Sequence, residues 1–329
     1  MAVASESNSR KDPFLMQCAL VSGAFLVCAY LCSLAAQEYW VFDLLRHFMT
    51  QYLVGSLILA PFFLWKKKYI LGGLVVLTGC ASFIEIVWRF HVAPIPSMLD
   101  DATIVKIAHY NKNIGNTDQS SLIAWIKSEN PDIFVIQEAG DTISHALYSL
   151  KDTYPYQVLE PRKHAFGQVL ASKFPIVDSA VVRTKAYSFE NFYIHALIQI
   201  PDGPEISYYT IHPPPPVNAQ YSKQRNGDLD AIGDAVATDK SKNIIVSGDW
   251  NITAYSPYFS NLMQKTGLQN IYISPTPIPT WPSQYVFQIF QIPIDYVLFK
   301  GDMILLERRR ADAMGSDHYP VVASFALKN

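Results

Sequence analysis

Residues 243–251, Asn-Ile-Ile-Val-Ser-Gly-Asp-Trp-Asn, contain the pattern that decides the fold. A short apolar run of strand-forming residues leads into a turn that carries a carboxylate, Asp249, and an amide, Asn251. Catalytic side chains are commonly held at strand ends, where a rigid scaffold positions them. We therefore expect a strand at 243–247 with functional side chains directly after it.

The same arrangement recurs through the C-terminal two thirds of the chain. Further strands are predicted at 103–108, 133–136, 168–172, 194–200, 206–211, 294–299 and 321–325, and helices at 119–130 and 222–238. Strands outnumber the helices between them, which predicts an α/β sandwich of sheets covered by helices. The polar residues at or beside the ends of these strands are Asn111, Glu138, His212, Asp249, Asn251, Asp295, Asp317 and His318.

Each of these residues has an ordinary structural explanation when it is taken alone. A carboxylate or amide after a strand can simply shape a turn, and His212, which opens the proline run 213–216, can be a plain loop residue. Hydrolysis of a phosphate ester, however, uses all of them together. It needs oxygen ligands for a hard cation, a base for water, and donors to the charge that develops on phosphorus.

The oxygen-bearing residues Asn111, Glu138 and Asp317 are the expected ligands of Mg²⁺, with Mn²⁺ as the alternative ion. Other hydrolytic chemistries lack their motifs in this sequence. There is no nucleophile elbow, no HExxH and no P-loop. The chemistry therefore points to activated water rather than to a covalent intermediate.

The remaining polar residues are expected to act as a base, as hydrogen-bond donors and as a carboxylate that positions one of the donors. Asp249 is expected to orient or deprotonate the attacking water. Asn251, His212 and His318 are expected to stabilise the negative charge that develops on phosphorus. A histidine that acts as a donor should be held by a carboxylate, and Asp295 is available for His318.

At these positions the sequence resembles the endonuclease/exonuclease/phosphatase superfamily, which includes DNase I-like nucleases, sphingomyelinases and inositol polyphosphate phosphatases. The motifs, in the family's order, are IAHYN at 107–111, PDIFVIQE at 131–138, FGQVLASKFPI at 166–176, TIH at 210–212, SGDWN at 247–251, IDYVL at 294–298 and SDHYP at 316–320. The resemblance covers nearly all of residues 103–327. It implies a four-layered α/β sandwich, two stacked sheets flanked by helices, with the site at one end of the sheets.

The resemblance also implies the same roles position by position, with Glu138 as the main metal ligand. Two positions depart from the family's pattern. Trp250 replaces the usual Phe, and Tyr319 replaces the usual Arg, which implies one contact fewer to the substrate. The resemblance offers no carboxylate partner for His212.

The first 92 residues have a different composition. Half of the whole chain is apolar and only 16% is charged, against about 25% charged residues in an ordinary soluble protein. The apolar excess lies in three stretches, 13–36, 48–65 and 69–88, each long enough to cross a bilayer as a helix. We expect residues 1–92 to be a membrane anchor, 93–102 a linker and 103–329 the catalytic domain.

Lys and Arg residues in short loops predict the orientation of this multi-pass anchor. Arg10 and Lys11 precede the first stretch, and three lysines, 66–68, separate the second stretch from the third. Both groups belong on the cytoplasmic side, which puts the catalytic domain on the extracytoplasmic side, the periplasm in a bacterium. A cleavable signal peptide ending near residues 34–36 is the alternative, and it leaves the domain on the same side.

Charge narrows the expected substrates. Before residue 93 lie seven of the 26 Lys and Arg and five of the 28 Asp and Glu, so the catalytic domain has a net charge near -4. Nucleic-acid-binding domains usually show a basic face, and the one basic run, residues 308–310, is expected to be a solvated edge. The charge balance therefore argues against a polynucleotide substrate. The expected location outside the membrane makes a lipid headgroup or a small phosphodiester the candidate substrate. All four cysteines, Cys18, Cys28, Cys32 and Cys80, lie in the anchor, so the domain has no thiol nucleophile.

Three alternatives remain open. A nuclease acting on DNA or RNA fits the resemblance. A catalytically inactive, membrane-bound binding module would show broken metal or base positions, yet every position that matches is intact. A transporter would need polar residues facing one another in the spans, where Glu85 qualifies, but Glu85 and Arg89 are expected to form an ion pair at a helix end. No obligate protein partner is evident.

Overall fold

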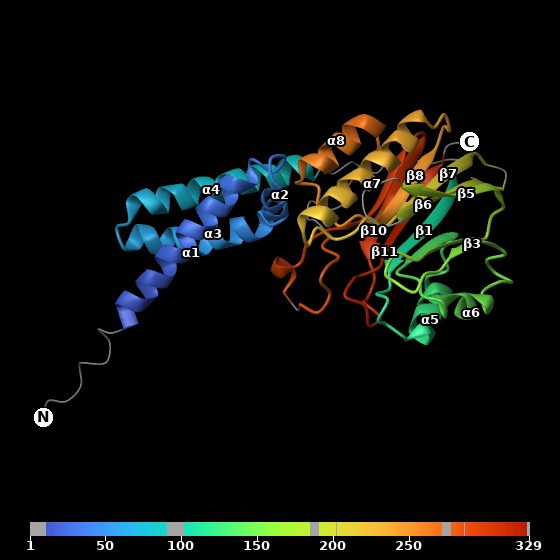
Figure 1. Cartoon of the computed structure of the whole chain (residues 1–329), viewed down its shortest axis with the longest axis horizontal. Helices are drawn as coiled ribbons and strands as arrows, with labels where there is room; N and C mark the ends of the chain where they lie inside the picture. Colours follow the sequence, from blue (N-terminus) through green and yellow to red (C-terminus); the bar gives the residue numbers. More distant parts are fainter. Residues whose placement is uncertain are drawn as a thin grey trace, which may run out of the picture. The chain divides into compact units, whose positions relative to one another are not determined.

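The computed structural model describes residues 11–90, 102–184, 191–201, 203–271, 278–285 and 287–327. Contacts divide the chain into two compact units, residues 1–89 and 90–329, drawn in Figure 1 mainly in blue and from green to red. Of the linker predicted at 93–102, all but Ala102 lies outside the described residues.

The N-terminal unit is helical, and its described helices are α1 (Lys11–Ser33), α2 (Trp40–Arg46), α3 (Met49–Trp65) and α4 (Tyr69–Arg89). Two helices, α1 and α4, are long and apolar enough to cross a membrane. The α2–α3 pair, bent by 65°, would be a third span if it acts as one. The sequence does not predict α2, because Asp43 and Arg46 interrupt its apolar pattern.

Glu85, in α4, has a nearer partner than the one expected. Its carboxylate lies 2.5 Å from an Arg46 guanidinium nitrogen, whereas Arg89 Nε lies 3.8 Å away. The expected Glu85–Arg89 pair is therefore present, but the nearer cation comes from the short helix α2. This ion pair links α2 to α4.

The C-terminal unit is built on two sheets (Figure 1). The first holds β1 (Thr103–Asn111), β2 (Ile133–Gln137), β3 (Tyr156–Glu160), β4 (Gln168–Ser172), β10 (Met303–Arg310) and β11 (Val321–Leu327). The second holds β5 (Ile176–Thr184), β6 (Asn191–Gln199), β7 (Glu205–Ile211), β8 (Ile244–Asp249) and β9 (Asp295–Lys300). Their strand orders are β10-β11-β1-β2-β4-β3 and β5-β6-β7-β8-β9.

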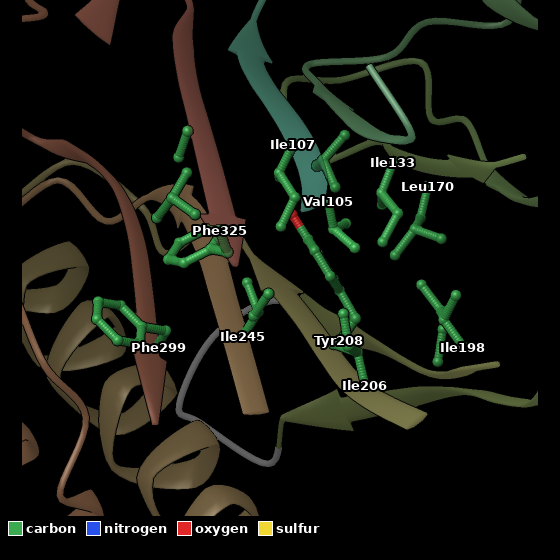
Figure 2. Close-up of a cluster of buried hydrophobic side chains, with 14 of the residues drawn as sticks. Val105, Ile107, Ile133, Leu170, Ile198, Ile206, Tyr208, Ile245, Phe299 and Phe325 are labelled. Carbon is green, nitrogen blue, oxygen red and sulfur yellow. The ribbon is translucent and has the colours of Figure 1, made fainter. Parts of the chain in front are cut away.

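The alternation of side chains along each strand creates the core between the sheets. Val105 and Ile107 of β1 point toward the second sheet, whose Tyr208 and Ile245 belong to the same buried cluster. Figure 2 shows these side chains meeting between the strands. The next two odd-numbered positions of β1, His109 and Asn111, therefore face the same way, toward the second sheet.

The outer faces of the sheets are covered by helices. Ala108 and Tyr110 of β1 pack with side chains of α5 (Gln119–Glu129) and α6 (Ile143–Tyr148). On the other sheet, α7 (Ala219–Thr238) and α8 (Pro257–Thr266) bury Leu229 and Leu262. A short 3-10 helix, η1 (Gln288–Phe290), precedes β9. The order helix, sheet, sheet, helix confirms the predicted four-layered α/β sandwich.

Every strand and helix predicted for this unit is present, with its ends shifted by three residues at most. Missing from the prediction are β3, β5, β10, α6 and α8. β5 is largely exposed, so polar residues interrupt its pattern, and β10 ends in three arginines.

The arginines of β10 also correct an expectation. Residues 308–310 do not form a solvated edge, because Arg308 is buried and donates to Asn270 at 2.8 Å. Arg309 pairs with Glu129 at 2.6 Å, and Arg310 donates to the backbone of Pro279. These side-chain contacts make the run part of the unit's own hydrogen-bond network rather than a basic groove.

Candidate active site

Two pairs of neighbouring strands deliver polar side chains to one end of the sheets. β1 and β2 run parallel with Asn111 beside Gln137, and β8 and β9 run antiparallel with Asp249 opposite Asp295. The buried Gln137 joins the sheets, because its Oε1 accepts from the backbone N of Asp249 at 2.8 Å. Its Nε2 donates to the carbonyl oxygen of Ile211, also at 2.8 Å. One amide thus holds the end of β2 against the ends of β7 and β8.

Most of the predicted residues converge on Oδ2 of Asp249. Asn111 Nδ2 donates to this oxygen at 3.0 Å, and Nε2 of His212 and of His318 lie 3.4 and 3.5 Å from it. Asn251 Nδ2 lies 3.5 Å away, and the backbone N of Asn251 donates to Asp249 Oδ1. Asp249 is almost fully buried, and the oxygens of a buried carboxylate need such hydrogen-bond partners.

Asp295 is buried between two histidines. Its Oδ2 lies 2.9 Å from His318 Nδ1, and its Oδ1 lies 3.2 Å from His109 Nε2. The expected Asp295–His318 pair is therefore present, and His109 is an additional member that the sequence argument does not include. With both carboxylate oxygens bound, Asp295 orients the His318 ring so that Nε2 faces Asp249.

His212 follows β7 and acquires a partner that its sequence position does not reveal. Its Nδ1 lies 3.1 Å from the carbonyl oxygen of Ala165, so the other ring nitrogen faces Asp249. The ring of Phe166 lies 5.5 Å from the ring of His212. Asn251 donates to the carbonyl oxygen of Pro213, which links the chain after His212 to the turn after β8.

The three residues predicted as metal ligands do not all contact one another. Asn111 Nδ2 donates to Glu138 Oε1 at 3.0 Å as well as to Asp249. Asp317 instead accepts from Asn113 Nδ2 at 2.7 Å and from Trp281 Nε1 at 3.0 Å. The structure thus brings Glu138 and Asn111 into contact, and it connects Asp317 to them through the turn that follows β1.

Three residues of the site have a left-handed backbone that non-glycine residues rarely adopt. The φ angles are 61° for Asn113, 55° for Glu138 and 49° for Asn251. Such a conformation costs on the order of 1 kcal/mol or more per residue and persists where surrounding contacts enforce it. Here it turns the chain sharply after β1, β2 and β8, which directs the polar side chains toward one another.

The C-terminal unit matches a known protein family. Residues 109–318 match the Endonuclease/Exonuclease/phosphatase family. The chain belongs to this family. No curated protein matches the chain by sequence. The matched region begins at His109 and ends at His318, the two histidines that bind Asp295.

Solved structures share the fold of this family. An endonuclease/exonuclease/phosphatase from Beutenbergia cavernae has a TM-score of 0.60 and 19% identity, covering 69% of this chain and 72% of that chain. D. rerio TDP2, complexed with single strand DNA product, has a TM-score of 0.58 and 12% identity, covering 68% of this chain and 99% of that chain. Sphingomyelinase C from Streptomyces griseocarneus has a TM-score of 0.50 and 16% identity, covering 69% of this chain and 100% of that chain. At these identities the likeness shows the fold alone.

The carboxylates of the site favour the protonated forms of His318 and His212. Burial by itself lowers the pKa of His318, but Asp295 and Asp249 outweigh it and raise that pKa to about 10. Burial also opposes charge on His212, yet Asp249 and Glu138 raise its pKa. For Asp295, burial raises the pKa, but His318 and His109 outweigh it and hold the pKa below its usual range.

Enzymes of the family typically use divalent metals, and the described residues offer suitable donors. Asp249, Asp295 and His318 place ligand atoms within 4.8 Å of one another. Asp295, however, binds a histidine with each oxygen, which fits a hydrogen-bonded pair better than a metal ligand. Glu138 and Asp249 instead direct two carboxylates at one nitrogen, Asn111 Nδ2. A divalent cation beside these oxygens would relieve their mutual repulsion, so this donor set fits the ion.

Four contributing residues are missing from the prediction. His109 has a signal in the sequence, because it shares the strand face of Asn111 two residues later. Gln137 directly precedes Glu138 at a strand end, where a polar residue in an apolar run is informative. Asn113 and Trp281 carry no such signal, since their importance depends on contact with Asp317.

Proposed function

We propose that the C-terminal unit hydrolyses phosphodiester or phosphomonoester bonds with activated water and a divalent cation, Mg²⁺ or Mn²⁺. Family membership supports this, because members act as phosphoesterases, nucleases or sphingomyelinases. The observation that carries the proposal is Asp249 Oδ2, which lies within 3.5 Å of Asn111 and of two histidines. A carboxylate and protonated donors at one point match what in-line attack of water on phosphorus requires.

The reaction uses these groups in complementary ways. Asp249 takes a proton from the attacking water, whose oxygen forms the new bond to phosphorus as the bond to the leaving oxygen breaks. His318 and His212, with raised pKa values, donate to the phosphoryl oxygens that gain negative charge. One of these two protonated histidines gives its proton to the leaving oxygen, while the other keeps its hydrogen bond to the phosphoryl group. Asn251 supports the phosphoryl group, and Asp295 keeps His318 in position.

Glu138 is the proposed main ligand of the cation, aided by Asn111 and Asp317. When bound, the ion supplies charge neutralisation for the phosphoryl group. The chain's own contribution is to hold Glu138 beside Asn111, at 3.0 Å, through the sharp turn after β2.

We also propose that residues 1–92 anchor this enzyme in a membrane, that 93–102 link the parts, and that 103–329 form the catalytic domain. The apolar helices α1 and α4 support the anchor. The lysines at 66–68 and the residues Arg10 and Lys11 support an extracytoplasmic domain under the positive-inside rule.

The test measures turnover by the purified full chain in detergent with Mg²⁺, Mn²⁺ or EDTA. Substrates are bis-p-nitrophenyl phosphate, p-nitrophenyl phosphate, plasmid DNA, sphingomyelin and phosphatidylinositol phosphates. Asp249→Asn and His318→Gln should each lower kcat by about a hundredfold or more, because each removes a proton-transfer or donor group. The matched controls are Asp302→Asn and His145→Gln, both at exposed positions outside the site, and they should retain full turnover.

The outcomes separate the open functions. Cation-dependent turnover that disappears in both site variants supports the enzyme, and the best substrate decides between nuclease, lipase and phosphatase. If no substrate turns over and calorimetry detects no Mg²⁺ or Mn²⁺ binding, the proposal is wrong and the binding module is favoured.

A further inference from the structure

The segment before β9 that contains η1 exposes a group of aromatic side chains. In residues 284, 285 and 287–290, which we call the aromatic loop, Tyr285, Phe287 and Phe290 are 53%, 68% and 54% exposed. The rings of Tyr285 and Phe290 lie 6.0 Å apart. In the rest of this unit, as far as it is described, the exposed large aromatic residues are Tyr148 and Tyr156, on separate elements. Single exposed apolar residues are ordinary, whereas a cluster marks an interaction surface.

Hydrogen bonds hold the aromatic loop in place from its base. Trp281 and Ile292 pair as an antiparallel bridge across the start and end of the segment. Gln291 Nε2 donates to the carbonyl oxygen of Tyr285 at 2.7 Å, and Arg310 donates to Gln291 Oε1 at 3.0 Å. The loop therefore has a fixed base, and its aromatic side chains stay exposed instead of folding onto the core.

The base of the aromatic loop is also the support of the candidate active site. Trp281 Nε1 donates to Asp317 Oδ2 at 3.0 Å, and the backbone N of Ser283 donates to the carbonyl oxygen of Asp317 at 2.8 Å. Asp317 directly precedes His318. Since Tyr285 follows Ser283 by only two residues, whatever the loop contacts lies close to the site.

The length of the segment that joins the two units indicates what this surface contacts. Between Phe90 and Ala102 run twelve peptide steps, which span about 40 Å when fully extended. If α1 and α4 cross a bilayer, the C-terminal unit cannot leave the neighbourhood of its surface. Residues 284–292 include no charged side chain, and aromatic residues are favoured where a protein meets the lipid headgroups.

We propose that the aromatic loop inserts into the surface of the bilayer that anchors the chain, so that the site receives a phosphoester carried by a lipid headgroup. The substrate class, but not the membrane contact, rests on the proposed phosphoesterase function. A lipid substrate then reaches Asp249 and His318 from the surface in which the loop is embedded.

The membrane contact is tested without any activity assay. The full chain, with Cys18, Cys28, Cys32 and Cys80 replaced by alanine, receives a nitroxide at Phe287→Cys and is reconstituted into phosphatidylcholine vesicles. In spin-label relaxation measurements, the label at 287 should be more accessible to oxygen, which concentrates in lipid, than to a water-soluble nickel chelate. A label at Tyr148→Cys, the exposed aromatic position on α6, is the matched control and should show the reverse preference. Equal preference for the nickel chelate at both positions overturns the membrane contact.

The substrate class is tested by kinetics in the same vesicles. Phe287→Ser combined with Phe290→Ser should lower turnover of the best lipid phosphoester by about tenfold or more, because the insertion is lost. Turnover of bis-p-nitrophenyl phosphate, which is soluble, should stay within about twofold of the parent. Equal loss on both substrates would show that the loop only supports the site, and it would overturn the lipid assignment. If the parent hydrolyses neither substrate, the proposed function fails, while the spin-label result still decides the membrane contact.

Discussion

His109 adds a second histidine to Asp295 and changes what this carboxylate can do. Asp295 Oδ2 binds His318 Nδ1, while Oδ1 lies 3.2 Å from His109 Nε2. A carboxylate held at one oxygen can rotate, whereas one held at both is fixed in its plane. His109 therefore positions His318 indirectly and is a positioning residue rather than a group that touches the substrate.

Replacing His109 tests this role. His109→Leu should lower kcat by about tenfold to a hundredfold with KM unchanged, because a misplaced His318 weakens transition-state contacts more than substrate binding. His109→Gln keeps an N–H donor and should recover part of the loss. The control His145→Leu, on the exposed side of α6, should have no effect. A raised KM with unchanged kcat would show that His109 serves substrate binding instead.

The Asp295–His318 pair also predicts how stability depends on pH. Because the pKa of His318 is raised to about 10 from an ordinary 6.5, its contribution to the free energy of unfolding is complete below pH 6.5. That contribution is lost as the pH rises toward 10. The pKa of Asp295 is lowered, so its contribution is present above its ordinary value of 3.8 and is lost as the pH falls below it.

Asp295→Asn should therefore flatten the alkaline limb of the stability curve. The parent should lose up to about 1.4 kcal/mol per pH unit for one proton between pH 6.5 and 10, and the variant should lose much less. Urea unfolding of the detergent-solubilised chain at several pH values measures this, with Asp302→Asn as the exposed control. Parallel curves for parent and variant would contradict the coupling.

At the scale of elements, the site depends on how the ends of strands from both sheets are joined. Gln137 is the cross-link: it satisfies the backbone N of Asp249 and the carbonyl oxygen of Ile211 from the end of β2. Both backbone groups are buried, where an unpaired polar group costs about 1–3 kcal/mol. The amide thus contributes to the fold and places Asp249 at the same time.

Gln137→Leu should leave both backbone groups unpaired and destabilise the C-terminal unit by roughly 3 kcal/mol. For a domain of this size, such a loss lowers the melting temperature by about 6–12 °C. Gln157→Leu is the matched control, because Gln157 makes a single local contact to the carbonyl oxygen of Tyr154. Thermal unfolding monitored by near-UV circular dichroism compares the two variants. If both variants lower the melting temperature equally, the Gln137 contacts between the sheets stabilise the unit no more than the local contact of Gln157 does.

At the scale of the whole molecule, an apolar helical unit and a four-layered unit share one chain. The carboxylates of Glu138 and Asp249 come from opposite sheets and point at one amide, Asn111 Nδ2. A cation held by Glu138 would lie beside Asp249 and would attract carboxylates from both sheets. Any ligand that binds only the folded state stabilises it.

Mg²⁺ should accordingly raise the melting temperature of the C-terminal unit in the full chain. At about a hundred times its Kd, an ion stabilises by about 2.7 kcal/mol, and EDTA should reverse the shift. Glu138→Gln should abolish the shift, whereas Glu307→Gln, a half-exposed glutamate on β10, should retain it. A shift that survives in Glu138→Gln would place the ion elsewhere, with the Asp249, Asp295 and His318 cluster as the next site to test.

Local patterns in the sequence determine a large part of this protein. The apolar residues of β1 and β8 predict strands, and the motifs at 247–251, 294–298 and 316–320 together predict the family and the position of Asp249. These inferences hold because strand formation and side-chain direction depend on neighbours within a few residues. The apolar stretches before residue 93 predict helices long enough for a membrane for the same reason.

Only the tertiary structure decided which of these residues meet. His109 binds Asp295 across 186 positions of sequence, and Gln137 reaches Asp249 from the opposite sheet. The partner of His212, the burial of Arg308 and the closeness of the aromatic loop to Asp317 are equally non-local. Such contacts are set by strand order, register and the packing of one sheet on the other. No window of sequence contains that information, whereas the type of each strand and the face of each side chain can be obtained from the local pattern alone.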